Sequence, residues 1–439
     1  MRYWGLSAIF FAKATLGLAD EGNVVAAYYE NWSQYRQPSG GRSVFFPKNI
    51  DPTILTDIHF AFAIFGFVDA SLDPNNPHLT GDYLIQPVEW NDQSILYQQI
   101  QDLKQINPKL RSILTIGGWG FNDPNDPNGM GTTTYKLFSE MVSSEASRTQ
   151  FIQSAIAYAK QYGFDGIEID WEYPGDLTRG GTNADFGNFL TLLSAMQTAC
   201  KAQSPPLTLC YASPALIPAG VPSQYKDNPQ TYYQWLKECS DYVDRMHVMT
   251  YDYHGAFDNP KITGVNAPLM ADTDPSSTNF IKATMENYII NGVDPAKIVL
   301  GLASYGHSYS GVQNLSQTSN GPGHVFAGAG SAGPSTKSPG LLAYYEIADA
   351  TATGQLTFGA DSTTQTAYGY NTSTQEWVSF DTPDTITLKA QYAKSLGLKG
   401  VMLWAIDDDE YAWGNTFPNL RSAYRVLYPE EKKFIKKPM

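Results

Sequence analysis

The chain contains few of the residues that build disulfide frameworks or metal centres. Its 439 residues include three cysteines, Cys200, Cys210 and Cys239, so at most one bridge can form within the chain. The sequence has no CxxC pair and no Cys/His cluster, and its six histidines are scattered. A disulfide scaffold is therefore excluded, and we expect neither a metal nor a cofactor.

Positive charge and long apolar runs are also scarce. Lysine and arginine together number 29, against 43 aspartates and glutamates, which gives a net charge of −14 at pH 7. The phosphates of nucleic acids and of anionic membranes would repel such a chain. Beyond the N-terminus, no segment has the ~20 consecutive apolar residues of a membrane span. We therefore expect neither a nucleic-acid nor a membrane partner.

Residues 1–19 have the layout of a secretory signal peptide. Arg2 precedes an apolar run (residues 3–12), and small residues follow up to Ala19, where we expect cleavage. Lys13 interrupts the apolar region and leaves an N-terminal extension as the alternative. We expect a secreted, extracellular protein.

The rest of the chain alternates between β-type and helix-type sequence. Apolar spacing of three and four residues in 147–162, and after Asp185 and Asp384, predicts helices. Eight strands separated by helices predict an α/β fold, a (β/α)8 TIM barrel. The runs that we predict to be strands are 23–29, 57–65, 110–118, 164–172, 207–213, 245–252, 297–306 and 400–407.

An open doubly wound sheet is the alternative architecture. That fold usually carries a Gly-rich turn after its first strand, whereas the corresponding stretch here reads YYENWSQY (28–35). A barrel places its chemistry at the C-terminal ends of its strands. The distinctive residues cluster at these ends: Trp32, Trp119, Glu172, Tyr251, Asp252 and Trp404.

Residues 306–380 break the alternation. They include a Gly/Ser/Pro-rich part (321–340), a helix-like LLAYYEIADA (341–350) and Thr-rich, strand-like sequence. A structureless loop of this length is uncommon in a compact domain, so we expect a small α+β insertion between strands seven and eight, with a partly disordered segment as the alternative. The predicted parts are the signal peptide (1–19), the barrel with strands one to seven (20–305), the insertion (306–380), the completion of the barrel (381–429) and a charged tail (430–439).

The stretch FDGIEIDWEYPG (164–175) places three carboxylates on one face of a predicted strand. Side chains alternate along a strand, so Glu168, Asp170 and Glu172 lie on the same side, about 6.6 Å apart along the backbone. Two carboxyls brought together by their side chains cannot both ionise cheaply. One of them holds a proton, and the last in the row can act as a general acid near neutral pH.

Two other interpretations of this row have less support. A metal site would normally add His or Asp residues from nearby strands, and no matching cluster is visible in the sequence. A solvated edge strand is hard to reconcile with the intervening Ile167, Ile169 and Trp171 in a parallel barrel.

The segment DGIEIDWE (165–172) resembles the active-site signature of glycoside hydrolase family 18, the chitinases and related enzymes, usually Asp-Gly-x-Asp-x-Asp-x-Glu. VVAAYYENW (24–32) is similar to the first strand of the family, and LTIGGW (114–119) to its Ser-x-Gly-Gly-Trp segment. MTYDYHG (249–255) resembles its Met-x-Tyr-Asp motif, and GVMLWAIDDDE (400–410) its last strand. The resemblance implies the barrel, a groove walled by the insertion, and retaining hydrolysis of β-1,4-linked N-acetylglucosamine polymers.

The resemblance also implies catalytic roles. Glu172 matches the proton donor to the glycosidic oxygen, and the 2-acetamido oxygen of the substrate itself attacks the anomeric carbon. Asp170 matches the residue that holds the acetamido nitrogen and stabilises the oxazolinium intermediate. Tyr251 matches the tyrosine that hydrogen-bonds the acetamido group, and Glu168 is the first acid of the row.

The same resemblance implies residues around the sugar. Trp404 should form the floor under the −1 sugar, and Trp119 should stack on an aglycone-side sugar. The other substrate-binding candidates are Asp252, Met249, Tyr28, Trp32 and Tyr253, and the supporting candidates are Thr115 and Asp165.

Three positions depart from the family pattern. Glu168 stands where the family usually has Asp, and Thr115 replaces the usual Ser. In the family, that Ser and the Tyr matching Tyr28 hydrogen-bond the first acid of the row, which is Glu168 here. We therefore hypothesise that the replacements at positions 168 and 115 are linked. His307 stands where relatives often carry Arg, which puts the contacts to glycone-side sugars in question.

Three functions are compatible with these patterns. The first is a chitinase, which we expect to be a monomer acting on chitin or chito-oligosaccharides. An endo-β-N-acetylglucosaminidase is disfavoured by the insertion and the Trp-lined groove. A chitin-binding, lectin-like relative without activity would typically lose the terminal acid, whereas Glu172 is present.

Overall fold

The computed structural model of the chain describes residues 22–42, 44–126, 129–272, 278–412 and 416–429. The predicted signal peptide (1–19) and charged tail (430–439) lie outside the described residues. Within the described parts, no helix is both long and apolar enough to cross a membrane.

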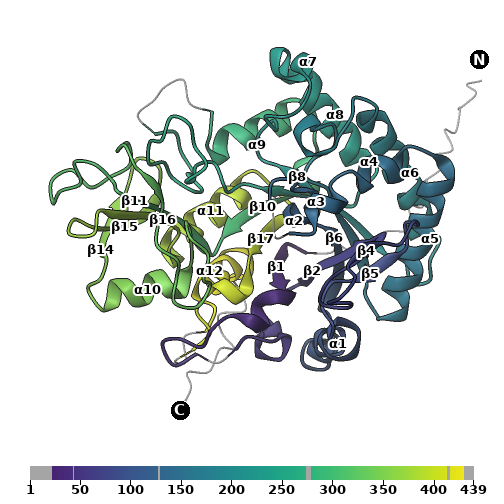
Figure 1. Cartoon of the computed structure of the whole chain (residues 1–439), viewed down its shortest axis with the longest axis horizontal. Helices are drawn as coiled ribbons and strands as arrows, with labels where there is room; N and C mark the ends of the chain where they lie inside the picture. Colours follow the sequence, from purple (N-terminus) through teal and green to yellow (C-terminus); the bar gives the residue numbers. More distant parts are fainter. Residues whose placement is uncertain (1–21, 43, 127–128, 273–277, 413–415, 430–439) are drawn as a thin grey trace, which may run out of the picture.

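Eight parallel strands close into a barrel (Figure 1). Neighbours pair in the order β1-β2-β6-β7-β8-β9-β10-β17, and β17 returns to β1, so the sheet is closed rather than open. The predicted TIM barrel is therefore confirmed. The strands are β1 (Val24–Glu30), β2 (Asp57–Phe65), β6 (Arg111–Gly117), β7 (Gly166–Asp170), β8 (Thr208–Pro214), β9 (Arg245–Met249), β10 (Ile298–Ala303) and β17 (Gly400–Trp404).

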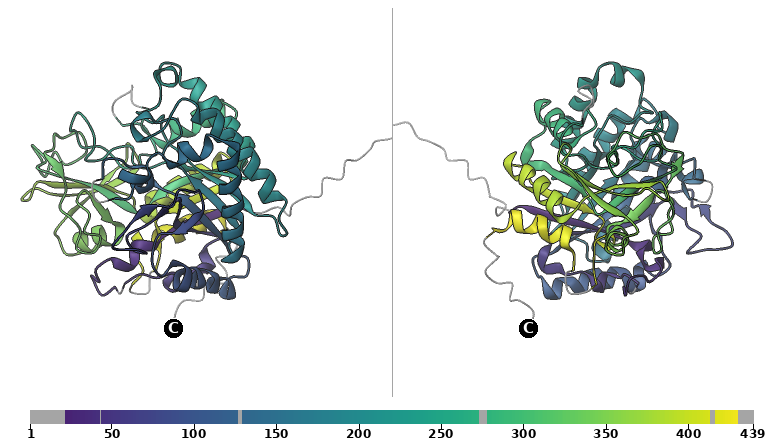
Figure 2. Two further views of the ribbon diagram at one scale, coloured as in Figure 1. Left: turned by 45° about the vertical axis from the view of Figure 1, so that its right-hand side comes forward. Right: turned by 90° about the vertical axis from the view of Figure 1, so that its left-hand side faces the viewer.

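The helices lie on the outside of the barrel (Figures 1 and 2). The longer ones are α1 (Tyr97–Ile106), α5 (Glu145–Gln161), α6 (Asp185–Lys201), α8 (Pro229–Asp241), α9 (Ile281–Ile290), α11 (Pro383–Ser395) and α12 (Pro418–Leu427). The shorter ones are α2 (Trp119–Asn122), α3 (Gly131–Thr134), α4 (Leu137–Val142) and α7 (Ser223–Asp227).

Local capping chemistry sets the helix ends. The Ser144 side chain accepts a hydrogen bond from the backbone N–H of Ser147 and caps α5. Thr382 caps α11, and Pro383 occupies its first position, where no backbone N–H is needed. Gly397 follows α11 with φ of 68°, a conformation that glycine adopts without steric cost.

The two faces of the barrel strands carry different chemistry. Outward-facing residues such as Phe60 and Ile167 pack with helix residues such as Phe151 in the main apolar core. Several inward-facing residues are polar although they are fully buried: Asp57, His59, Glu168, Arg245 and His247. Burying polar groups in this way is costly unless they pair with one another.

The predicted α+β insertion is present between β10 and β17. An antiparallel sheet in the order β12-β11-β16-β15-β14, with β13 paired to β11, stands beside the barrel (Figure 2). Tyr309, Phe326 and Trp377 lie in its apolar core. Its elements are β11 (Tyr305–Ser310), β12 (Gly328–Ala329), β13 (Leu341–Ala343), α10 (Tyr344–Ala352), β14 (Thr357–Asp361), β15 (Thr366–Asn371) and β16 (Glu376–Phe380).

The segment between β2 and α1 adds short strands at the barrel edge. β3 (Phe67–Val68) pairs with β4 (His78–Leu79), and β5 (Ile85–Pro87) lies antiparallel to β2. The three cysteines are buried and unbridged, in α6, β8 and α8.

Candidate active site

A cleft opens at the C-terminal ends of the barrel strands, where a TIM barrel carries its chemistry. Its volume is about 510 Å³, and its wall combines aromatic side chains with a few acids. Sequence-predicted residues that line it are Trp32, Trp119, Asp170, Glu172, Met249, Tyr251, Asp252 and Trp404. Lining residues without a predicted substrate contact include Phe62, Phe121, Met130 and Tyr305.

Asp170 and Glu172 enter the cleft from the end of β7. Asp170 is the last residue of the strand and is 2% exposed, and Glu172 follows in the loop at 8% exposed. Burial raises the pKa of Asp170 well above its ordinary value, and the neighbouring Glu172 and Glu168 carboxylates raise it further. Asp170 therefore binds a proton more tightly than an ordinary aspartate does.

Glu172 is poised to exchange a proton near neutrality. Burial raises the pKa of its carboxyl to about 7, against the opposing effect of the Arg179 guanidinium. A general acid works best when its pKa lies near the working pH. The pair thus combines a proton donor, Glu172, with a buried neighbour, Asp170, whose pKa is raised.

Arg179, which the sequence analysis did not identify, connects Glu172 to Trp119. Its Nε donates to the Glu172 backbone carbonyl at 2.7 Å, and its Nη2 donates to the Trp119 carbonyl at 2.8 Å. The guanidinium carbon lies 3.5 Å from the centroid of the Trp119 ring. This support holds the indole at the rim, where Trp119 remains 52% exposed.

Aromatic rings form one wall of the cleft. Trp404, at the end of β17, stacks on Phe62 with ring centroids 5.7 Å apart. Trp32, in the 3-10 turn after β1, stacks on the same Phe62 at 5.9 Å. These flat, partly apolar faces suit a sugar ring. Phe62 was missed because it lies in a long apolar strand, where a core position is the default expectation.

The motif after β9 brings Tyr251 and Asp252 to the opposite side. Asp252 has φ of 58° and accepts hydrogen bonds from the Tyr305 hydroxyl at 2.5 Å and from His307 Nε2 at 2.7 Å. Burial raises the pKa of the Tyr251 phenol well above its ordinary value, and Asp252 raises it further. Tyr251 therefore keeps its hydroxyl proton and is available as a hydrogen-bond donor.

Glu168 lies below the cleft, inside the barrel. It accepts hydrogen bonds from the Tyr28 hydroxyl and from Thr115 Oγ1, each at 2.9 Å. The Nδ1 atoms of His59 and His247 lie 3.0 Å from its two carboxylate oxygens. Burial opposes ionisation of Glu168, but these imidazoles lower its pKa below the usual range. No sequence motif marks the two histidines as part of the site.

The structure places three predicted site residues away from the cleft. Tyr28 is 2% exposed and lies inside the barrel, where its hydroxyl donates to Glu168. Tyr253 does not line the cleft: it is 3% exposed, packs in the main core, and its hydroxyl lies 2.6 Å from Thr284 Oγ1. Asp165 precedes β7 and lies at the opposite end of the barrel, where it pairs with Lys104 Nζ at 2.5 Å. None of the three lines the cleft, and Asp165, at the opposite end of the barrel, does not support the acids of the site.

Two clusters contain residue types that can bind metals, but their contacts are those of ion pairs and hydrogen bonds. Glu30, Asp407 and Asp408 surround Arg36, which lies 2.8 Å from Asp407 and 2.9 Å from Asp408. The guanidinium therefore occupies the place of a cation. His59, Glu168 and His247 form the second cluster, in which both imidazoles already face the carboxylate.

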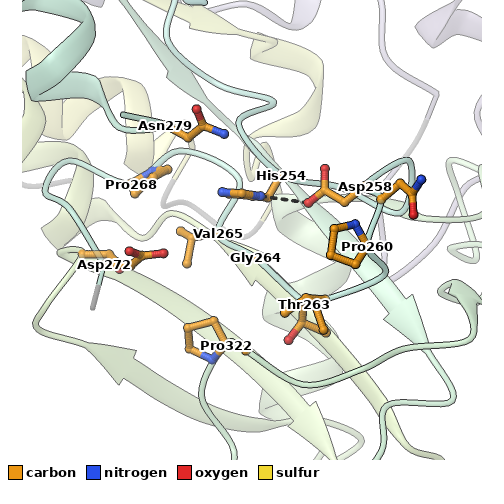
Figure 3. A pocket seen from close by; sticks show the side chains of 14 residues that line it. His254, Asp258, Pro260, Thr263, Gly264, Val265, Pro268, Asp272, Asn279 and Pro322 are labelled. Carbon is orange, nitrogen blue, oxygen red and sulfur yellow. Dashed lines mark hydrogen bonds and ion pairs between the residues drawn. The ribbon is translucent and has the colours of Figure 1, made fainter. Parts of the chain in front are cut away.

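A second hollow lies beside the segment that follows β9. It has a volume of about 470 Å³, and in it His254 Nδ1 pairs with Asp258 at 2.8 Å (Figure 3). Prolines and glycines make up much of its wall. Glu168, Asp170 and Glu172 are not among the residues that line it.

Comparison with known proteins agrees with this geometry. Mouse (Mus musculus) chitotriosidase-1 is 31% identical over 390 residues, which cover 88% of this chain and 73% of that protein. The Ostrinia furnacalis group IV chitinase, solved in complex with allosamidin, superposes with a TM-score of 0.75 at 27% identity, covering 93% of this chain and 99% of that one. Human YKL-39 is described as a pseudo-chitinase that retains chitooligosaccharide binding. It superposes with a TM-score of 0.74 at 27% identity, covering 92% of this chain and 100% of that one.

The family signature extends over nearly the whole described chain. The model of glycosyl hydrolases family 18 matches residues 24–409, from the first residue of β1 to the loop after β17. The match includes β7 and β17, which end in Asp170 and Trp404, and the segment after β9 that carries Tyr251. This chain belongs to glycosyl hydrolase family 18.

Proposed function

We propose that this protein is a chitinase, which hydrolyses β-1,4-linked N-acetylglucosamine polymers with retention of configuration. The observation that carries the proposal is the Asp170–Glu172 pair, buried in an aromatic-walled cleft, with a Glu172 pKa of about 7. A carboxyl of that pKa can donate a proton and later take one back.

The reaction follows from these positions. Glu172 protonates the glycosidic oxygen while the carbonyl oxygen of the 2-acetamido group attacks the anomeric carbon, so the leaving chain departs as an alcohol. Asp170 and Tyr251 hold the acetamido group through this step, and Asp170 stabilises the positive oxazolinium. Water then attacks the same carbon, Glu172 removes its proton, and the acetamido group is released.

Aromatic faces provide the binding surface in this proposal. Trp404 lies under the sugar at the point of cleavage, and Trp119 stacks on a sugar of the leaving chain, supported by Arg179. Met249, Asp252 and Trp32 line the remaining wall.

A fluorogenic chitotriose substrate tests the proposal. The wild type should release the fluorophore, and Glu172→Gln, which keeps the side-chain shape but cannot donate a proton, should lose at least about 10²-fold in kcat. Retained turnover in Glu172→Gln, or equal hydrolysis of a glucose polymer without N-acetyl groups, would contradict it.

A chitin-binding protein without activity is the second candidate. It is favoured by the likeness to human YKL-39 and by Glu168 in place of the usual family Asp. Such a protein would bind chitin in a sedimentation assay and release no fluorophore at any pH.

We further propose that the protein is exported and works as a monomer on extracellular chitin or chito-oligosaccharides. The layout of residues 1–19 supports export. Expression in a secreting host should yield a mature protein that begins near residue 20. Its light-scattering mass should match one chain.

A further inference from the structure

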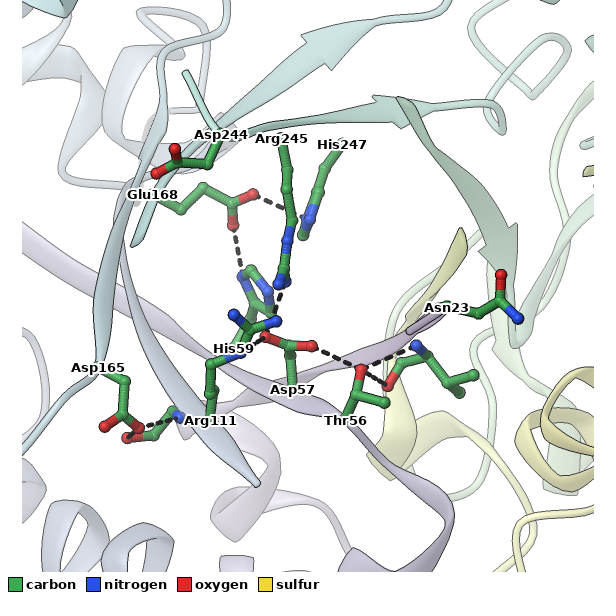
Figure 4. Close-up of polar contacts among 12 residues, drawn as sticks. Asn23, Thr56, Asp57, His59, Arg111, Asp165, Glu168, Asp244, Arg245 and His247 are labelled. Carbon is green, nitrogen blue, oxygen red and sulfur yellow. Dashed lines mark hydrogen bonds and ion pairs between the residues drawn. The ribbon is translucent and has the colours of Figure 1, made fainter. Parts of the chain in front are cut away.

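The interior of the barrel contains an ordered stack of polar side chains beneath the cleft. The upper layer joins Glu168 to Tyr28, His59, Thr115 and His247, which come from four other strands. The lower layer joins Asp57 to Arg245 at 2.8 Å and to Arg111 at 3.0 Å (Figure 4). Asp57 precedes His59 by two residues on β2, as Arg245 precedes His247 on β9, so the layers lie about 6.6 Å apart along the strands.

The hydrogen bonds of the upper layer saturate the Glu168 carboxylate. Oε1 faces the Tyr28 hydroxyl and His247 Nδ1, and Oε2 faces Thr115 Oγ1 and His59 Nδ1. A carboxylate has about four lone-pair sites, and each of them here has a donor. A proton on either oxygen would displace one of these bonds.

The contacts also define the state of the two histidines. The Nε2 atoms of His59 and His247 are buried and have no hydrogen-bond partner among the described residues. A neutral imidazole with its proton on Nδ1 donates to Glu168 and leaves only a lone pair at Nε2. An imidazolium would bury an N–H without an acceptor, which costs more. Burial also lowers the pKa of His247.

The charges of the two layers balance when the histidines are neutral. Glu168 contributes one negative charge, and the lower layer contributes one net positive charge, from Arg111 and Arg245 against Asp57. The other titratable groups around Glu168 are Tyr28, Cys210, Tyr251 and Asp170, and burial raises the pKa of each, which favours its uncharged form. This balance favours an ionised Glu168 even when neither imidazole is charged, and positive charge on His59 or His247 would lower the pKa of Glu168 further.

We propose that His59 and His247 are positioning residues that lock Glu168 as a fixed, ionised carboxylate behind Asp170. Glu168 then takes no part in passing protons, and its charge keeps the proton on Asp170. Proton exchange is confined to Asp170 and Glu172. This inference rests on the proposed chitinase reaction and assigns its acids different duties.

The pH dependence of kcat on the fluorogenic chitotriose tests this division of duties. Glu168→Gln removes the fixed charge, so Asp170 and Glu172 should lose their shared proton more easily. The basic limb of the kcat–pH profile should therefore move about one to two pH units downward. His59→Leu removes a donor, lets Glu168 bind a proton, and should move the limb in the same direction. His59→Asn restores an amide donor near the Nδ1 position and should return the limb toward its wild-type place.

Two controls separate positioning from folding. His78, exposed on β4, gives a matched His→Asn variant whose limb should stay at the wild-type pH. The melting temperature of each variant shows whether it is folded. An unmoved basic limb in folded Glu168→Gln and His59→Leu would overturn the proposal.

A readout independent of activity distinguishes failure of this proposal from failure of the proposed function. In protein labelled with nitrogen-15 histidine, His59 and His247 should keep the neutral Nδ1–H tautomer from pH 5 to pH 8. His59→Asn and His247→Asn assign the two signals among the six histidines. Titration of either to imidazolium in that range overturns the proposal even in an active enzyme. If both histidines keep the neutral Nδ1–H tautomer in a protein that releases no fluorophore, only the proposed chitinase activity is refuted.

Discussion

Arg179 illustrates how one side chain can tune both binding and proton transfer. It touches the Trp119 ring and the Glu172 backbone, and its charge lowers the pKa of Glu172. In Arg179→Gln the pKa of Glu172 should therefore rise, and the basic limb of kcat/KM should move upward by about one pH unit.

The direction of this shift is opposite to that expected for Glu168→Gln. Arg148, on α5, donates to the backbone carbonyl of Val142 and provides a matched Arg→Gln control that should leave the profile unchanged. A downward shift in Arg179→Gln would show that the guanidinium does not act on Glu172 through its charge.

Trp119 should contribute to binding of the leaving chain. Trp119→Ala should raise KM for chitohexaose about tenfold and change KM for short substrates less, because only longer chains reach the aglycone side. Trp90 is 59% exposed and does not line the cleft, so Trp90→Ala serves as the control. Equal effects of the two substitutions would argue against a specific stacking site at Trp119.

The hypothesis that Glu168 and Thr115 changed together can now be stated in terms of contacts. Glu168 reaches four donors, of which Thr115 is one. Glu168→Asp shortens the side chain by one methylene and should lose the bonds to His59 and His247. In a double-mutant cycle with Thr115→Ser, the effects on kcat should therefore couple by more than about 0.5 kcal/mol. Simple additivity would contradict the link.

At the scale of elements, the junction between the insertion and the barrel depends on a buried ion pair. Lys389 of α11 is fully buried and pairs with Asp381, which follows β16 and also accepts from Thr385 Oγ1 at 2.7 Å. Lys389→Met would leave the Asp381 carboxylate buried beside a thioether. We expect the free energy of unfolding to fall by about 3–5 kcal/mol in denaturant titration.

The partner substitution provides the control for this pair. Replacing both residues, Lys389→Met with Asp381→Leu, removes the unpaired charge and should recover part of the lost stability. If the double variant were as unstable as the sum of the two single variants, the pair itself would not be the source of the effect.

The sequence predicts elements well where local chemistry decides them. The barrel strands follow from apolar runs, and the ends of α5 and α11 lie within a few residues of the predicted bounds. The predicted strand 245–252 is too long, because β9 ends at Met249 and the chain then turns through Asp252. Tyr253, which the family resemblance placed in the groove, follows this turn and packs in the core. Alternation cannot identify the point where a strand stops.

The sequence predicted only those residues of the candidate site that lie within a recognisable motif. Glu172, Asp170, Tyr251 and Trp404 were identified because each lies in a recognisable segment at a strand end. His59 and His247 lie in strands distant in sequence, and only closure of the barrel brings them to Glu168. Such contacts depend on tertiary register, which a single sequence does not contain.

At the scale of the whole molecule, stability should not depend on the redox state. Cys200, Cys210 and Cys239 are all buried and unbridged, and burial raises the pKa values of their thiols. The native protein should therefore resist labelling by a thiol reagent and label three times per chain in denaturant. A reductant should leave the melting temperature unchanged, whereas a clear drop would reveal a bridge.

The circular order of the strands has a consequence for synthesis. β1 pairs with β17, the last strand to leave the ribosome, and the whole insertion is translated between β10 and β17. While the insertion is being translated, the nascent sheet therefore has two unpaired edges, at β1 and at β10, and it cannot become a barrel until residue 404 has emerged. Closure of the barrel must therefore wait for β17, and a chaperone that shields open sheet edges would act on this chain until that strand has been made.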